Sequence, residues 1–282
     1  MALATEKLGT TWSGRVETVD ADRARAYAAA TNDDNPAYRS GALAPPVFGV
    51  VPTWQSMSDA LTAMVPPEAF LMIVHGEHDM HFHLPLTPGQ SLATAAEAFS
   101  VRVGRSGTRY TMKVLSHEAA SGELVLEQYV TMFIRGMSDG ETAGPDKPDH
   151  GFPRGAREHP LGSYTVHVDD DQTYRYKEAS GDDNAIHVDP AVATAVGLPG
   201  IIVHGLCTMA MTSQAVIATT AAGNPARLRR LAVRFSRPVF PGNDVVTTVF
   251  DAGPGEGRHL YGFEAHSDGQ LVISNGRAEV SP

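Results

Sequence analysis

The chain has 282 residues, 42% of which are hydrophobic, and a formal net charge of −10 at pH 7. This length and apolar content suit one or two ordinary globular domains. The acidic balance argues against non-specific binding to nucleic acids, and no run approaches the roughly 20 apolar residues of a membrane span.

The cysteine content and the N-terminus bear on the cellular compartment. Cys207 is the only cysteine, so no intramolecular disulfide can form, which is typical of a reducing compartment. Its apolar neighbours favour a small core residue over a nucleophile. Residues 1–7 show neither an apolar secretion signal nor an Arg-rich transit pattern. We therefore expect a cytoplasmic protein.

The first half of the chain shows a helical segment, a polar loop at 33–38 and an apolar segment around Phe48. This order predicts a central helix after the loop. Apolar patterns predict strands at 91–103, 109–115 and 124–134. Residues 136–153 are rich in glycine, proline and aspartate and lack apolar periodicity, which predicts a linker or a long loop.

The second half contains the most informative loop of the chain. Asp182 and His187 lie five residues apart between two helical patterns, and Asn184 lies between them. This spacing does not share one helix face, but a tight loop can direct both side chains at one small volume. A carboxylate and an imidazole that face one water are suited to moving protons on and off a substrate. Taken alone, such a segment is more often an Asx-turn with a surface histidine.

Helix signals hold this loop on both sides. Helix 174–179 ends at Gly181, which suits a left-handed cap, and the next helix begins at Asp189–Pro190. A third helix begins after His204, where Gly205 lets a backbone N–H approach a ligand closely. Helix N-termini favour developing negative charge. Strands are predicted at 231–235, 245–250, 260–266 and 271–280.

Residues 176–206 resemble the signature of the MaoC-like (R)-specific enoyl-CoA hydratases, also called hydratase 2. The shared pattern is Tyr-x-x-x-Ser-Gly-Asp-x-Asn-x-x-His-x-Asp-Pro, followed by Gly-x-Pro-Gly-Ile-Ile-x-His-Gly-Leu. Residues 233–242 also resemble the family's strand after the central helix, whereas Ala185 stands where many relatives have proline. The resemblance implies an α+β fold of two tandem hot dogs, each a long central helix wrapped by a curved antiparallel sheet.

The two halves of the chain also resemble each other. The aligned pairs are Asp33 with Asp182, Asn35 with Asn184, Tyr38 with His187, and Phe48 with His204. Tyrosine and phenylalanine are poor replacements for imidazole chemistry near pH 7. The likeness to eukaryotic-type double-hot-dog hydratases implies a catalytically silent half at 1–135 that accommodates the acyl chain, a linker at 136–160 and a catalytic half at 161–282.

The resemblance implies reversible hydration of trans-2-enoyl-CoA to (3R)-3-hydroxyacyl-CoA. Asp182 is expected to act as general base and His187 as acid or relay, while Asn184 orients the loop. Gly205 is expected to donate its N–H to the developing oxyanion. The residues expected to bind the substrate are Ser180, His204, Arg234, Arg237 and Phe48. No cofactor is expected, because CoA is part of the substrate, and the protein is expected to form a homodimer.

Two clusters leave alternatives open. Five arginines between Arg227 and Arg237 suit the phosphates of CoA or, equally, a salt-bridged strand face. Four histidines crowd residues 75–83, and His81, His83 and Asp79 share a strand face that permits a metal site. The aligned second half has no histidine at the corresponding positions, so we predict no metal there.

His204 is expected either to line the site or to be a buried, hydrogen-bonded histidine.

Three other functions fit part of the pattern, since hot-dog folds serve several acyl-thioester enzymes. A dehydratase of acyl-carrier-protein esters would use the same chemistry with a different handle. A thioesterase would release free thiol. A non-catalytic acyl-thioester binding protein would not need Asp182, Asn184 and His187 together.

Overall fold

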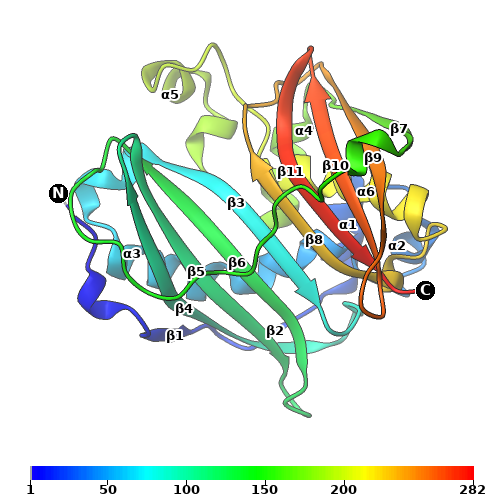
Figure 1. Cartoon of the computed structure of the whole chain (residues 1–282), viewed down its shortest axis with the longest axis horizontal. Coiled ribbons are helices and arrows are strands. Elements are labelled where there is room, and N and C mark those ends of the chain that lie inside the picture. Colours follow the sequence, from blue (N-terminus) through cyan, green and yellow to red (C-terminus); the bar gives the residue numbers. More distant parts are fainter. Residues whose placement is uncertain (1) are drawn as a thin grey trace. The chain divides into compact units, whose positions relative to one another are not determined.

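A computed structural model describes residues 2–282, and their contacts divide the chain into two compact units (Figure 1). Neither unit is continuous in sequence. Unit 1 comprises Met1–Thr18, Pro52–Leu84 and Gln90–His150. Unit 2 comprises Val19–Val51, Pro85–Gly89 and Gly151–Pro282. The compact units therefore do not coincide with the expected domains 1–135 and 161–282, and those domain boundaries stay a prediction.

Unit 1 is an antiparallel sheet with one helix, α3 (Trp54–Met64), packed against it. Its strands follow the order β1 (Thr11–Ser13), β4 (Ser91–Gly104), β5 (Gly107–Glu118), β6 (Leu124–Arg135) and β3 (Ile73–Phe82), with β2 (Glu17–Thr18) also paired to β4. Buried and half-buried residues alternate along β4, because successive side chains of a strand point to opposite faces. The three predicted strands of this half are confirmed.

The helix of unit 1 begins later than the sequence suggests. Residues Pro46–Thr53 form the 3₁₀ helix η2, and the α-helix starts only at Trp54. Pro52 explains the difference, because proline lacks an N–H and its ring clashes with the preceding turn of an α-helix. From Trp54 onward, α3 buries Met57, Ala60 and Met64.

The glycine- and proline-rich segment after β6 is held against unit 1 over its first part. Ala143 forms a β-bridge with Val101. Arg102 donates from Nη1 to the carbonyl of Ala143 (2.8 Å) and from Nη2 to a carboxylate oxygen of Asp146 (2.6 Å). Residues 136–150 thus form a long loop that packs within this unit.

The histidines of β3 and the following His83 do not converge on one point, although His75 and His78 contact each other with ring nitrogens 3.3 Å apart. His78 is buried and bonds to Gln128 (3.0 Å), His81 lies 3.2 Å from a carboxylate oxygen of Asp79, and His83 lies 3.6 Å from one of Glu127. Among residues 2–282, no group of three close potential metal ligands includes any of them.

In unit 2, antiparallel strands wrap around a long helix, α6 (Gly205–Thr220). Every residue of α6 from Leu206 to Ile217 is buried, including the polar residues Thr208, Thr212, Ser213 and Gln214. Its strands follow the order β8 (Leu228–Phe235), β11 (Gln270–Val280), β10 (His259–Ser267), β9 (Asp244–Pro254) and β7 (Pro160–His167). The central helix and the strands predicted for this half are confirmed.

Three further helices of unit 2 come from opposite halves of the chain. α1 (Ala21–Ala30) packs beside α4 (Gln172–Ser180), and α2 (Pro36–Arg39) follows α1. Tyr27 and Tyr176 join α1 and α4 through a buried hydrogen bond between their hydroxyls (3.0 Å). These contacts explain why residues 19–51 belong to the C-terminal unit.

Among residues 2–282, no helix is both long and apolar enough to cross a membrane.

Candidate active site

The loop after α4 is built from side-chain bonds to its own backbone. α4 ends at Gly181, whose φ of 80° is the left-handed conformation that glycine adopts without strain. The hydroxyl of Ser180 accepts a hydrogen bond from the N–H of Asp182 (3.1 Å). The carboxylate of Asp182 accepts one from the N–H of Asn184 (3.3 Å), and the side-chain amide oxygen of Asn184 accepts one from the N–H of Ile186 (3.3 Å). The loop is therefore an Asx-type turn, but one that ends on a buried histidine.

His187 lies in the short 3₁₀ helix η5 (Ala185–His187) and is only 8% exposed. Its Nδ1 lies 2.8 Å from the carbonyl oxygen of Ile202. A carbonyl only accepts, so Nδ1 carries the hydrogen and Nε2 keeps its lone pair. This bond fixes the tautomer in which Nε2 is free to accept a proton.

Asp182 and His187 lie close without bonding to each other directly. Their ligand atoms and that of His204 all lie within 4.8 Å of one another. No hydrogen bond joins the two side chains in the described chain, and a single water that makes two ordinary hydrogen bonds can bridge such a separation. The structure thus brings the predicted pair together, and the water between them stays a prediction.

Burial disfavours the charged forms of both groups. Burial raises the pKa of Asp182, although the nearby His187 opposes the shift. Burial lowers the pKa of His187, although the Ile202 carbonyl and Asp182 oppose it. A carboxylate with a raised pKa is a stronger base near neutral pH, and paired shifts of this kind are common at catalytic sites.

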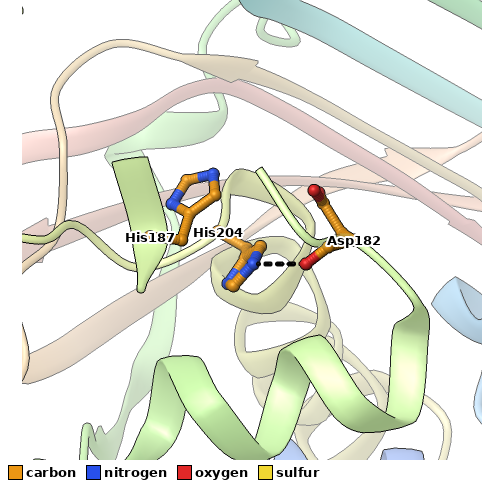
Figure 2. Close-up of side chains that lie close together, drawn as sticks. All are labelled: Asp182, His187 and His204. Atoms are coloured by element: carbon orange, nitrogen blue, oxygen red, sulfur yellow. Dashed lines mark hydrogen bonds between the residues drawn. The ribbon is translucent and has the colours of Figure 1, made fainter. Parts of the chain in front are cut away.

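His204 contacts both members of the pair. It is fully buried, and its Nε2 donates to the backbone carbonyl of Asp182 (3.1 Å), as Figure 2 shows. Its ring stacks on that of His187, with centroids 3.9 Å apart and 28° between the planes. The other expectation for His204, a direct contact with the substrate, stays a prediction.

The same three residues are the one group of close potential metal ligands among residues 2–282. A zinc ion lies about 2.0–2.1 Å from each imidazole nitrogen and close to both ring planes. Stacked rings direct their lone pairs side by side and not at a common point. The arrangement therefore suits a stacked pair better than a metal centre, and the absence of a metal stays a prediction.

Gly205 begins α6, as predicted. A Cβ at this position would lie 3.3 Å from the ring of Phe235, which is tighter than most side-chain contacts. The free N–H groups of the first helical turn and the helix dipole both favour negative charge at this end. The start of α6 therefore supplies the type of donor expected for an oxyanion.

The arginine cluster divides into paired and free members. Arg230 is buried and pairs with Glu279 (3.2 Å), and Arg227 donates to the carbonyl of Ser281 (3.0 Å). Arg234 and Arg237 are exposed and make no ion pair within residues 2–282. The salt-bridge interpretation holds for Arg230, while the two exposed guanidinium groups are available to a ligand.

Phe48 and Ser180 are both buried. Phe48 packs edge-on against Tyr27, with ring centroids 5.5 Å apart. Ser180 shapes the turn at Asp182, as described above. A contact of either residue with the substrate stays a prediction.

One residue that positions the site has no recognisable signal in the sequence. Arg23 of α1 donates from Nε to the carbonyl of Ala179 (2.9 Å) and from Nη2 to that of Ser180 (3.0 Å). A cation at the C-terminus of a helix satisfies free carbonyls and complements the helix dipole. Only the packing of α1 against α4 reveals this role.

The first-half loop keeps the backbone of the second. Asn35 (φ −54°, ψ 126°) and Asn184 (φ −56°, ψ 121°) have nearly the same dihedral angles, and each caps a short helix. The carboxylate of Asp33 accepts from the N–H of Asn35 (3.0 Å), as Asp182 does from that of Asn184. The two loops thus share their local backbone conformation, and the duplication of the two halves stays a prediction. Tyr38 replaces the histidine, and its buried hydroxyl has no hydrogen-bond partner among the described residues.

This retained carboxyl group should make stability depend on pH. Burial raises the pKa of Asp33 to about 6, above the value of about 3.9 for an unfolded aspartate. The folded state therefore holds this proton more tightly, and stability falls as pH rises from about 4 to about 6. Asp33→Asn should raise Tm at pH 8, by about 2–4 °C for each kcal/mol relieved, and change it little at pH 4. The exposed neighbour serves as control: if Asp34→Asn produces the same pH-dependent gain in thermal unfolding, burial of Asp33 is not the cause.

Comparison with known proteins supports the family resemblance that residues 176–206 indicate. Residues 153–264 match the family model described as MaoC like domain, and residues 39–136 match the MFE-2 hydratase 2 N-terminal domain. The chain is 25% identical over 240 residues to the "Probable enoyl-CoA hydratase 2" of Dictyostelium discoideum, covering 84% of this chain and 80% of the relative. It is 30% identical over 214 residues to the "3-hydroxyacyl-thioester dehydratase Y" of Mycobacterium tuberculosis, covering 73% and 72%. Other relatives are named as peroxisomal, so the cytoplasmic location stays a prediction.

The solved structure of a MaoC-like dehydratase from Phytophthora capsici has a TM-score of 0.83 and 24% identity to this chain, covering 98% of this chain and 97% of that one. At this identity the likeness concerns the fold, and the α+β double-hot-dog fold expected from the sequence is confirmed. Family models match both halves, and a relative that is 30% identical spans more than two thirds of both chains. The chain therefore belongs to the MaoC-like hydratase 2 family and is a hydro-lyase.

Proposed function

We propose that this protein catalyses the reversible, (R)-specific hydration of trans-2-enoyl-CoA to (3R)-3-hydroxyacyl-CoA. The observation that carries the proposal is the pairing of Asp182 with His187 within 4.8 Å, in a loop whose hydrogen bonds hold both residues. Relatives named enoyl-CoA hydratase 2 and 3-hydroxyacyl-thioester dehydratase support the substrate class and the reversibility.

In the proposed reaction, one water lies between the two side chains. Asp182 removes a proton from the water as its oxygen bonds to C3 of the enoyl group, and the π electrons move towards C2 and the thioester oxygen. His187 accepts a second hydrogen bond from the same oxygen at Nε2. As the proton held by Asp182 returns to that oxygen, the oxygen's remaining proton passes to Nε2 and from there to C2. The carboxylate is restored, and the elements of one water have been added. The pair titrates as a unit, so its macroscopic pKa values belong to both residues.

The thioester oxygen gains negative charge as C2 becomes enolate-like. The N–H of Gly205 at the start of α6 is the proposed donor to this oxygen. Loss of one such donor typically costs roughly 3 kcal/mol of transition-state stabilisation. Asn184 contributes by capping η5 and so fixing the turn between the two reacting side chains.

The proposal is tested by the absorbance of the conjugated thioester with crotonyl-CoA and a longer trans-2-enoyl-CoA, without added cofactor and with chelator present. The expected result is loss of absorbance without thiol release, and chiral analysis should identify the 3R alcohol. Activity on the longer ester would support the proposed accommodation of acyl chains by the N-terminal half. Thiol release would indicate a thioesterase, and preference for the carrier-protein ester in competition would indicate the corresponding dehydratase. No reaction with any of these esters would indicate a binding protein.

The two exposed arginines should contribute to binding of the CoA handle. Arg234→Ala and Arg237→Ala should each raise KM for crotonyl-CoA about three- to tenfold, with kcat nearly unchanged, because a charge-assisted bond to phosphate contributes roughly 1 kcal/mol or more. KM for a crotonyl thioester of N-acetylcysteamine, which lacks the phosphates, should stay the same. Arg154→Ala removes an exposed arginine elsewhere in unit 2 and should change neither value. Equal effects on both thioesters would contradict a role for these arginines in phosphate binding.

A further inference from the structure

His204 is the buried titratable group beside the catalytic pair that the proposed mechanism does not use. It is fully buried, contacts both members of the pair and directly precedes Gly205 at the start of α6. We propose that His204 is a positioning residue, whose Nε2–H holds the peptide carbonyl of Asp182 while its ring face holds the imidazole of His187. This inference rests on the proposed hydration reaction.

The hydrogen bond to Asp182 defines the state of His204. The carbonyl of Asp182 only accepts, so Nε2 of His204 carries the hydrogen (3.1 Å). Nδ1 is buried and has no hydrogen-bond partner among residues 2–282. Burial, together with the charge that His187 can carry, lowers the pKa of His204 to about 3. His204 is therefore a neutral donor with one fixed tautomer, and it does not compete for the protons of the reaction.

Three hydrogen bonds together leave Asp182 little freedom. Its N–H is held by the hydroxyl of Ser180 (3.1 Å), its carbonyl by His204, and its carboxylate by the N–H of Asn184 (3.3 Å). The two peptide groups that flank the Cα of Asp182 are thus both fixed. Removal of the His204 bond frees the carbonyl side and lets the carboxylate drift from the water. A misplacement of about 1 Å can reduce a rate by roughly 100-fold.

The stacked rings hold the second member of the pair. His187 is fixed in its plane by its bond to Ile202 (2.8 Å), and His204 covers one face of its ring at 3.9 Å. The other neighbour of His204 is Tyr176, with ring centroids 4.8 Å apart. His204 therefore connects the imidazole of His187 to Tyr176 of α4 through contacts between their rings.

The first half of the same chain provides an internal comparison. Where the catalytic histidine has become Tyr38, the residue at the position of His204 is Phe48. Phe48 keeps an aromatic contact, at 5.5 Å from Tyr27, but it has no N–H to donate. The half without the catalytic imidazole thus also lacks the donor that holds the aspartate carbonyl.

Two substitutions separate the hydrogen bond from the ring. His204→Phe keeps an aromatic ring and removes the donor, while His204→Gln keeps an amide donor at a similar reach and removes the ring. We expect His204→Phe to lower kcat for crotonyl-CoA hydration about 10- to 100-fold with KM within about threefold of wild type. His204→Gln should recover most of that loss. Cys207→Ala, a buried change in the helix that follows His204, should leave kcat within about twofold and serves as the packing control.

A spectroscopic readout tests the hydrogen bond without turnover. In isotope-labelled full-length protein, the ¹³C shift of the Asp182 carbonyl should move in His204→Phe towards the value of an unbonded carbonyl, and it should stay near wild type in His204→Gln and Cys207→Ala. An unchanged shift in His204→Phe, or a wild-type kcat in the folded variant, overturns the inference. Lack of hydration by the wild-type protein, with the carbonyl shift changed as expected, would instead remove the proposed function and keep the contact.

Discussion

Asp182→Asn should lower the rate of enoyl-CoA hydration by roughly 10²–10⁴-fold, the usual contribution of a positioned general base. The amide has nearly the shape of the carboxylate, and its oxygen can still accept the N–H of Asn184. The turn should therefore persist while the proton acceptor is lost. Burial raises the pKa of Asp182 and so makes it a stronger base than an exposed aspartate, and asparagine cannot replace that basicity.

The neighbouring carboxylate provides the matched control for this experiment. Asp183 is exposed, so Asp183→Asn removes the same charge one residue away without touching the buried pair. It should change kcat/KM by no more than about threefold, since screened surface charges contribute little. Both variants should be assayed with crotonyl-CoA and checked for an unchanged Tm. Losses of similar size in the two variants would show that Asp182 is not the base.

The second large effect concerns folding of the catalytic unit. A fragment of residues 151–282, which contains the whole family signature, should fail to fold alone because it lacks residues 19–51. Tyr176 would lose the hydroxyl partner provided by Tyr27. The side chain of Gln214 would lose the Thr31 carbonyl that it contacts at 2.6 Å. Each large apolar side chain exposed costs about 1.5–3 kcal/mol, while a whole domain is stable by only about 5–15 kcal/mol.

The fragment is compared with a rearranged chain in which residues 19–51, 85–89 and 151–282 are joined by flexible linkers. Circular dichroism and amide proton dispersion should show little tertiary structure in the fragment and a cooperative thermal transition in the rearranged chain. A well-dispersed spectrum from residues 151–282 alone would mean that α1 adds little to the stability of unit 2.

Much of the site could be predicted because its signals are local. Gly181 ends α4, and Asp189 accepts from the N–H of Ala191 (2.8 Å) at the start of α5 (Pro190–Ala195), so the loop between them is defined by its own residues. The strands follow from alternation, which depends only on neighbouring residues. The aligned loops at Asn35 and Asn184 share their dihedral angles for the same reason.

The remaining features depend on contacts between segments far apart in the sequence. Arg23 reaches the carbonyls of Ala179 and Ser180 across 156 and 157 residues, and no local pattern marks that pairing. His204 could be recognised as part of a motif, but its bond to a peptide carbonyl requires the path of the folded chain. The 3₁₀ stretch before α3 is a local effect of Pro52 that the alignment of the two halves conceals.

The division of unit 2 between two ends of the sequence has a consequence during translation. Residues 19–51 leave the ribosome early, whereas β11, beside β8 and β10, ends only at Val280. At about 5–20 residues per second, synthesis of unit 2 is completed roughly ten to fifty seconds after α1 has been made. Unit 1 is complete in sequence at His150 and can fold during that interval. During that interval α1 has emerged without the later segments of unit 2 that bury it, while unit 1 can already be folded. Tyr27 and Phe48 are then exposed and accessible to chaperones.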